Sequence, residues 1–132
     1  KSDAKYDSLV PSYIFKDNQK LITISPRDFS FIIEENMRDI FEALSNCKIR
    51  VNMMQNSAIS FSICVDDDEQ KVDNLIKCLE VEYQIKYNAG LNLMTVRHYN
   101  ETILGQLTQN KEVLLEQRSR HTTRFVLRDI SQ

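Results

Sequence analysis

The chain contains the same short pattern twice, and this internal repeat constrains its fold more than any other feature. The segment 21–25 (LITIS) recurs as 93–97 (LMTVR), at an offset of 72 residues. Further along, 48–66 matches 111–129 in length and layout, at an offset of 63, so the helical connection of the second copy is nine residues shorter. Each copy reads as strand, helix, strand, turn and strand. Repeated small αβ units predict paired sheets, and the seam between such sheets is a common place for a small ligand.

The first copy shows the periodicities of alternating strands and helices. Strands are predicted at 20–25, 50–54, 59–65 and 85–87 from β-branched and alternating residues. From Phe31 the apolar period changes to that of a helix, and a second helical stripe begins at Val72. Asp67 and Gln70 fit a capping box at the start of that second helix. The dipeptide 89–90 (AG) is then expected to turn the chain into the second copy.

The second copy is incomplete. Asn100 is expected to cap a short helix that Gly105 weakens, and strands follow at 113–117 and 123–127. Too few residues remain for a closing helix and strand, so this copy must complete its fold by packing against the first copy or a partner chain.

Three segments are therefore expected: a linker at 1–19, a first unit at 20–90 and a second, shorter unit at 91–132. The linker carries one apolar patch at 13–15 (YIF) that is free to dock on another surface. Because the chain begins at Lys1 rather than Met, it reads as a piece of a longer protein.

The composition is that of a globular protein, with 42% hydrophobic and 27% charged residues. A net charge of −2 gives no reason to expect nucleic acid or an anionic membrane as a partner. No apolar run approaches the ~20 residues that span a bilayer, and the sequence shows no signal-peptide pattern. The three cysteines are an odd number without CxxC spacing, which favours reduced thiols and a cytoplasmic location over a disulfide or metal site.

Catalytic and cofactor motifs are absent from the sequence. His98 and His121 are the only histidines, and neither lies at a diagnostic spacing from Cys, Ser or a carboxylate. Two glycines are too few for a Walker loop or a dinucleotide fingerprint. The acidic run 66–69 lacks the spacing and glycine of a calcium loop, so helix capping explains it better than a metal. We expect no catalytic residue, metal or cofactor in this chain.

A set of basic residues near the C-terminus has two readings: a phosphate-binding face, or the basic half of a salt-bridged outer face. Its members are Lys111, Arg118, Arg120, Arg124 and Arg128. They are interrupted by Glu112, Glu116 and Asp129 and lack a stacking aromatic platform, which favours the salt-bridged face over RNA binding.

Two turns of the first copy are candidates for a ligand site. The end of the first strand and the start of the next helix lie at one rim of the sheet, where backbone N–H groups can receive a carboxylate. The turns 25–30 and 55–57 belong to that region, and Asn52, Gln55, Asn56 and Ser57 offer amides and a hydroxyl. Asn and Ser also occur in turns for local backbone reasons alone, and both explanations stay open.

Two segments resemble a known family. The stretch 51–66 (VNMMQNSAISFSICVD) resembles the strand–turn–strand of the regulatory ACT domains of aspartate kinase. Residues 113–117 (VLLEQ) followed by 122–127 (TTRFVL) resemble the same region. The similarity runs from about Leu21 to Asp129 and follows the order of elements in the tandem ACT region.

The resemblance implies an α+β fold of two ferredoxin-like βαββαβ units, with antiparallel sheets side by side and the second unit interleaved with the first. It also implies a homodimer that binds an end-product amino acid, lysine or threonine, at an ACT–ACT interface. Binding would inhibit an N-terminal kinase domain that uses ATP and Mg to phosphorylate aspartate. The Lys-Phe-Gly-Gly-Thr signature of that domain is absent here. The chain is thus expected to be the regulatory half, not itself an enzyme, of a kinase of amino-acid biosynthesis.

The effector-binding positions implied by the resemblance fall in two regions. They are Asp28, Phe29, Ser30 and Phe31 after the first strand, and Val51, Asn52, Gln55, Asn56 and Ser57 along the second strand and its turn. The chain departs from the family pattern in two ways. The turn at 25–31 has no Gly, and Asn52 stands where lysine-sensitive members can carry an acid. Either departure points to a different effector or a lost one.

The leading hypothesis is a homodimeric amino-acid sensor with lysine favoured over threonine. The alternative is a structural dimerisation module that binds no effector. A third option, an enzyme that uses a histidine and a cysteine, requires those side chains to meet in one cleft. The sequence leaves open the effector, a fusion to homoserine dehydrogenase and any assembly beyond a dimer.

Overall fold

The computed structural model describes residues 12–28 and 30–129, and the chain divides into two compact units. One unit runs from Asn18 to Ala89, and the other combines residues 12–17 with 90–129. Strands hydrogen-bond in the order β2-β3-β1-β4-β6-β5. No helix in the described part of the chain is long and apolar enough to cross a membrane.

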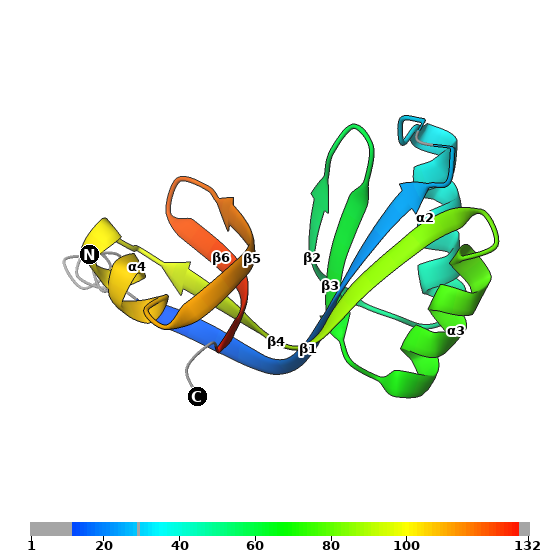
Figure 1. The fold of residues 1–132 in the computed structure, drawn as a ribbon. Coiled ribbons are helices and arrows are strands. Elements are labelled where there is room, and N and C mark those ends of the chain that lie inside the picture. Colours follow the sequence, from blue (N-terminus) through cyan, green and yellow to red (C-terminus); the bar gives the residue numbers. More distant parts are fainter. Residues whose placement is uncertain (1–11, 29, 130–132) are drawn as a thin grey trace, which may run out of the picture. The chain divides into compact units, whose positions relative to one another are not determined.

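The unit Asn18–Ala89 has the element order of a complete βαββαβ fold. Its elements are the second part of β1 (Ser12–Pro26), α2 (Glu34–Asn46), β2 (Val51–Asn56), β3 (Phe61–Asp66), α3 (Glu69–Leu79) and the first part of β4 (Tyr83–Arg97). The strand order β2-β3-β1-β4 is that of a ferredoxin-like sheet. Both β1 and β2 pair antiparallel with β3. Both helices cover the same face of this sheet (Figure 1). The α+β, ferredoxin-like prediction is confirmed.

The core of this unit lies between the sheet and the two helices. Strand positions on one face alternate with those on the other, so Ile22 pairs with Ile63 and Ile24 with Phe61 on the helix side. These side chains pack with residues of both helices in one cluster. The helix residues of the cluster that are most deeply buried are Ile40, Leu44, Val72 and Leu75. The apolar stripes predicted for the two helices are thus the surfaces that they bury.

Helix α3 begins one residue later than the predicted capping box. Asp68 precedes the helix, and its side-chain carboxylate accepts from the backbone N–H of Lys71 at 3.3 Å. Asp67 forms an ion pair with Lys20 instead, with 3.5 Å between Nζ and Oδ1. The prediction that Asp67 caps α3 is therefore wrong. Two consecutive aspartates offer the same chemistry, and only the tertiary partner Lys20 separates their roles.

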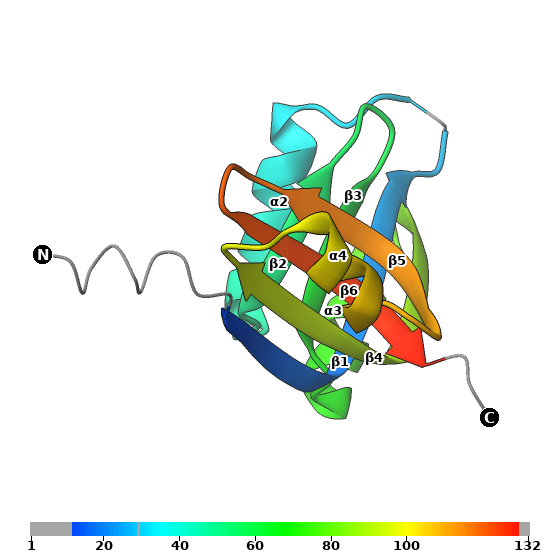
Figure 2. The ribbon, with the colours of Figure 1, turned by 90° about the vertical axis from the view of Figure 1, so that its left-hand side faces the viewer.

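The second unit is built from residues 12–17, the latter part of β4, α4 (Glu101–Leu107), β5 (Lys111–Arg118) and β6 (Thr122–Asp129). Asn100 caps α4 as predicted, since its side-chain oxygen accepts from Ile103 N–H at 2.8 Å. Helix α4 lies across β4, β6 and β5 (Figure 2). Its residue Leu104 joins a core cluster with Met94, Val96, Phe125 and Leu127.

The strand that completes this second unit comes from the N-terminal part of the chain. Strand β1 begins at Ser12, eight residues before the predicted start at Lys20, so residues 12–19 of the predicted linker are strand; residues 1–11 of that linker lie outside the described residues. Residues 12–17 group with the second unit, which accounts for its missing closing strand. The patch Tyr13, Ile14 and Phe15 lies in this strand, and each of its side chains is more than half exposed.

No turn separates the two repeats. Residues 83–97 form the single strand β4, and Gly90 lies within it at a φ of 70°. The prediction of a turn at Ala89–Gly90 is wrong, because Gly90 supplies a local left-handed backbone inside a continuous strand.

The two glycines make a matched pair for testing this backbone. We expect Gly90→Ala to destabilise the protein by about 1 kcal/mol, because residues with a side chain avoid positive φ. Gly105→Ala in α4 should stabilise it by about 1 kcal/mol, since alanine favours a helix and an added Cβ meets nothing within 4 Å. Urea unfolding of both variants measures the two effects. Equal effects of the two substitutions would contradict the backbone assignment.

Thr123 carries an unsatisfied polar group in the core of the second unit. The residue is fully buried, and within the described part of the chain its Oγ1 has no hydrogen-bond partner. We therefore expect Thr123→Val to raise the free energy of unfolding by about 1 kcal/mol, because the methyl group keeps the volume and removes the desolvation cost. The exposed Thr102→Val serves as control and should change stability little. A loss of stability in Thr123→Val would show that the hydroxyl has a partner.

Candidate functional site

The loop after β1 and the hairpin after β2 meet at one rim of the unit Asn18–Ala89. Ile24 of β1 and Asn56 of β2 both pair with Phe61, the first residue of β3. The two segments that follow those strands are joined directly, because the backbone N–H of Ile32 donates to the carbonyl of Ala58 at 2.8 Å. This rim, made of residues 27–28, 30–33 and 55–60, therefore brings together most of the positions that the sequence singled out.

Asp28 organises the first half of the rim. Its Oδ1 accepts from the backbone N–H of Ser30 at 3.1 Å and from the Ser30 hydroxyl at 2.6 Å. These two bonds hold the pKa of the Asp28 carboxyl below its ordinary value, and the bond from the Ser30 hydroxyl has the larger effect. The loop thus presents an ionised carboxylate at neutral pH. Phe29, also predicted to be part of the site, lies outside the described residues.

Helix α2 starts at this rim without a side-chain cap. Ile33 occupies the position before the helix and has no side-chain oxygen to offer. Asn36 turns back instead, so that its Oδ1 accepts from Ile33 N–H at 2.9 Å while its amide donates to the Tyr83 hydroxyl at 3.0 Å. Among the described residues no side chain caps the first-turn N–H groups of α2, so these groups can donate to an external acceptor such as a carboxylate. Glu34 and Glu35 add two carboxylates beside them.

The hairpin half of the rim is polar and partly satisfied within itself. The Ser57 and Ser60 hydroxyls are 2.9 Å apart, and Ser57 N–H donates to the Ser60 carbonyl at 2.9 Å. Asn56 is exposed, and its pairing with Phe61 places it on the helix side of the sheet. Gln55 is also exposed and pairs with Ser62 on the opposite face.

Val51 and Asn52 lie at the other end of β2 and do not join this rim. Five residues of extended strand separate Val51 from Asn56, a span of about 17 Å. The Asn52 amide donates to Gln19 Oε1 at 2.8 Å and to Asp66 Oδ1 at 2.9 Å. Asn52 therefore belongs to a polar cluster at the start of the unit's first strand. The structure therefore separates the eight predicted positions that it describes into these two groups.

The rim also exposes large apolar side chains. Phe31, Ile33 and Ile59 are exposed by 67%, 53% and 57% respectively. They come from both halves of the rim, which the bond between Ile32 and Ala58 holds together. Clustered exposure of this kind is typical of a surface that a partner covers.

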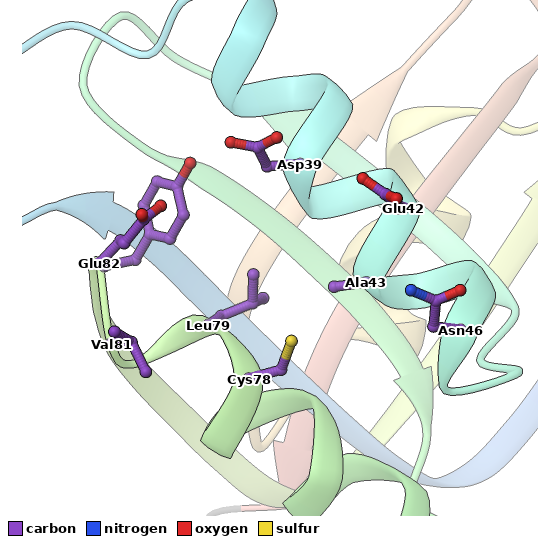
Figure 3. Close-up of a pocket in the computed structure, with 9 residues that line it drawn as sticks. Asp39, Glu42, Ala43, Asn46, Cys78, Leu79, Val81 and Glu82 are labelled. Atoms are coloured by element: carbon purple, nitrogen blue, oxygen red, sulfur yellow. The ribbon is translucent and has the colours of Figure 1, made fainter.

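A second feature of the same unit is a cavity of about 430 Å³ between α2, α3 and the start of β4 (Figure 3). Asp39, Glu42 and Glu82 surround an apolar floor that includes Ala43 and Leu79, so its walls attract cations. Sequence analysis did not predict this cavity. Its acidic residues lie on the polar sides of their elements and meet only when the helices pack.

Two groups near this cavity have raised pKa values. Burial raises the pKa of the Tyr83 hydroxyl, and the negative charges of Asp39 and Glu82 raise it further. Burial likewise raises the pKa of the Cys47 thiol, with a smaller effect of Cys78. A raised thiol pKa keeps Cys47 protonated and unreactive at neutral pH. All three cysteines are free thiols.

The two histidines lie close together at one end of the second unit. His98 N–H donates to the His121 carbonyl at 2.7 Å, and the ring centroids are 6.0 Å apart. All three cysteines belong to the unit Asn18–Ala89, so no histidine–cysteine pair forms within either unit. Among the described residues no three His, Cys, Asp or Glu side chains gather into a metal-binding group.

No family model and no curated protein matches the sequence. Solved structures do match the fold. A putative C-terminal regulatory domain of aspartate kinase from Porphyromonas gingivalis W83 is 15% identical, with a TM-score of 0.73 over 92% of this chain and 88% of that one. E. coli aspartokinase III in complex with lysine and aspartate is 17% identical, with a TM-score of 0.71 over 89% of this chain and 29% of that one.

A third match is the ligand-free regulatory subunit of aspartate kinase from Thermus thermophilus, which is 9% identical. Its TM-score is 0.64, over 92% of this chain and 89% of that one. The chain therefore has the fold of aspartate kinase regulatory domains and subunits, and it spans 29% of the length of the E. coli enzyme.

The Asp28 turn can be tested by titration. We expect Ser30→Ala to raise the pKa of the Asp28 carboxyl towards its ordinary value, because the hydroxyl bond is the larger cause of the depression. Carboxyl NMR shifts followed against pH measure this change. The pKa of Asp28 is lower in the folded than in the unfolded protein. Its ionised carboxyl therefore stabilises the fold at pH values above the unfolded-state pKa, and this stabilisation is lost as the pH falls through the folded-state pKa. Ser45→Ala, an exposed serine of α2, is the control. An unchanged Asp28 pKa in Ser30→Ala would contradict the turn.

Proposed function

We propose that this chain is the amino-acid-sensing regulatory region of an aspartate kinase, and that its effector binds at the rim of the unit Asn18–Ala89. The observation that carries the proposal is the hydrogen bond from Ile32 to Ala58, which joins the loop after β1 to the hairpin after β2 beside the uncapped start of α2. The fold match to aspartate kinase regulatory domains supports it.

The rim offers complementary groups to a free amino acid. The effector's carboxylate would accept from the first-turn N–H groups of α2, where the helix dipole favours negative charge. Its ammonium would lie against the carboxylates of Asp28, Glu34 and Glu35. Three acids suit a ligand with a second positive charge. Lysine is therefore the favoured effector, with threonine next.

A second copy of the chain would complete the site. Phe31, Ile33 and Ile59 are exposed around the proposed ligand position and need an apolar partner. A homodimer formed through this rim would cover them and enclose the effector at an ACT–ACT interface. The bound ligand would then have contacts from both chains.

The regulatory effect would be a shift in population. An effector inhibits only if it binds the inactive arrangement of the enzyme more tightly than the active one. A coupling of about 1–3 kcal/mol gives an effect of about 5- to 150-fold. In this proposal the phosphorylation of aspartate, with its ATP and Mg, belongs to the N-terminal kinase domain of the parent protein. This chain supplies the sensor.

A second candidate function is a dimerisation module without an effector. The exposed apolar residues of the rim favour it, since they support an interface whether or not a ligand binds. The departure of Asn52 from the acid of lysine-sensitive members is also consistent with it, because its amide is already engaged by Gln19 and Asp66.

Calorimetric titration of the chain with lysine, threonine and methionine tests the proposal. We expect lysine to bind, and Glu34→Gln to weaken its binding by about fivefold through loss of a charge at the rim. Glu69→Gln is the matched control, because Glu69 is the first-turn acid of the other helix, α3. Glu69→Gln should leave the dissociation constant unchanged.

Sedimentation of the same proteins separates the two candidates. Ile59→Asp should break the dimer, and Val81→Asp, at a residue that is 76% exposed away from the rim, should not. Dimerisation through the rim without amino-acid binding would favour the structural module. The proposal would be refuted if no amino acid binds and Ile59→Asp leaves the oligomeric state unchanged.

A further inference from the structure

The β5–β6 hairpin of the second unit holds a cavity of about 390 Å³ with an arginine-rich wall. It is lined by Gln117, Arg118, Ser119, Thr122 and Arg124. All five residues belong to the hairpin or its turn, so the cavity is built by one local segment. Its volume lies in the range of small-molecule sites, about 300–1,000 Å³. None of the proposed effector contacts lies here.

Most of the basic residues around the hairpin are already paired. Lys111 pairs with Asp129, and Arg128 pairs with Glu112 at 2.8 Å. Arg118 binds two acids, Glu116 at 2.5 Å and Glu101 at 2.8 Å, and its guanidinium lies 5.7 Å from the centre of the Tyr99 ring. Three members of the basic set therefore form the salt-bridged outer face expected from the sequence.

Arg124 differs from these three. It lines the cavity, its side chain is exposed, and its guanidinium has no hydrogen bond or ion pair with any described residue. Arg120 is also exposed and unpaired within the described ranges, but it does not line the cavity. A guanidinium without an acid at the wall of a cavity is available to an external anion.

Strand register places further donors beside Arg124. Arg124 pairs with Thr95, and two residues earlier on the same face Thr122 pairs with Arg97 of β4. Arg97 is exposed and likewise unpaired among the described residues. The two arginines are therefore diagonal neighbours, about 7–8 Å apart at the backbone. The Thr122 hydroxyl lies on the same face and adds a donor.

The charge of the whole unit supports anion binding. Residues 12–17 and 90–129 contain seven Lys and Arg against five Asp and Glu, a net charge of +2. Residues 18–89 contain eight Lys and Arg against twelve Asp and Glu, a net charge of −4. The net charge of −2 for the whole chain is therefore the sum of two units of opposite sign. The only unit with a positive charge is the one with the arginine-lined cavity.

From this cavity we infer an oxyanion-binding site, in which Arg124 holds a carboxylate or phosphate group of a small organic ligand. The planar guanidinium donates two parallel N–H bonds to two oxygens of that group, and the Thr122 hydroxyl donates a third bond. Arg97 adds a second positive charge nearby. The cavity of about 390 Å³ has room for more than one phosphate group, so it can hold a ligand with a body beyond its anionic end.

Calorimetric titration at low salt with three probes tests this inference: inorganic phosphate, citrate and ATP without magnesium. We expect at least one probe to bind, and Arg124→Gln to weaken it by about tenfold or more. Arg120→Gln is the matched control, because it removes the same charge four residues away but outside the cavity, and should weaken binding less than about twofold. Raising the salt to about 0.3 M should weaken binding of the wild-type protein, since the site is exposed.

The probes also distinguish the source of the anion. Citrate binding alone assigns a carboxylate ligand, and binding of phosphate or ATP assigns a phosphate-bearing one. Arg124→Lys keeps the positive charge but cannot donate two parallel N–H bonds, so it should also weaken binding. Circular dichroism checks that each variant is folded. Equal weakening in Arg120→Gln and Arg124→Gln would reduce the effect to general electrostatics and overturn the inference. No binding of any probe at about 20 mM would overturn it as well. Lysine binding at the rim is measured separately, so either proposal can fail alone.

Discussion

Two long strands, β1 and β4, pass through both units of the chain, and the arrangement of everything else depends on them. Each changes unit near a residue with left-handed backbone, at Asn18 with φ 55° in β1 and at Gly90 with φ 70° in β4. The unit Asn18–Ala89 is one continuous segment, whereas the other unit needs residues 12–17 from the beginning of β1. Domains of about 60 residues bury too little surface to be very stable alone, and shared strands connect the hydrogen bonding of both. Loss of pairing at either strand would affect two cores at once.

Much of the fold could be predicted from the sequence because its signals are local. The stripe containing Ile40 and Leu44 predicted the buried face of α2, and Asn100 predicted the start of α4. The errors concern positions where distant residues decide. The sequence predicts a turn at Gly90, but the residue lies within the long strand β4. It also predicts that Asp67 caps α3, but Asp67 pairs with Lys20 instead. Short periodic segments are informative about element type, whereas continuity and partner choice depend on tertiary packing.

The candidate rim was predictable for a topological reason. In a βαββ arrangement the end of the first strand and the hairpin after the second lie at the same edge of the sheet, so turn residues such as Asp28 and Ser57 come together. Asn52 shares a strand with that hairpin but lies too far along it. The cavity between the two helices was missed because its residues come from separate elements, such as Glu42 of α2 and Glu82 of the turn before β4.

The separation of charge between the units has a functional consequence. A net −4 in residues 18–89 and +2 in the other unit favour ligands of opposite sign, while the screening length of about 8 Å at physiological salt limits each field to its own surroundings. The acidic rim around Glu34 suits an ammonium group, and the hairpin around Arg124 suits an oxyanion. Because β1 and β4 are common to both units, a ligand that stabilises either unit also stabilises strands that the other one uses. If both proposed sites bind their ligands, occupation of one would change the affinity of the other, and by linkage the effect would be reciprocal.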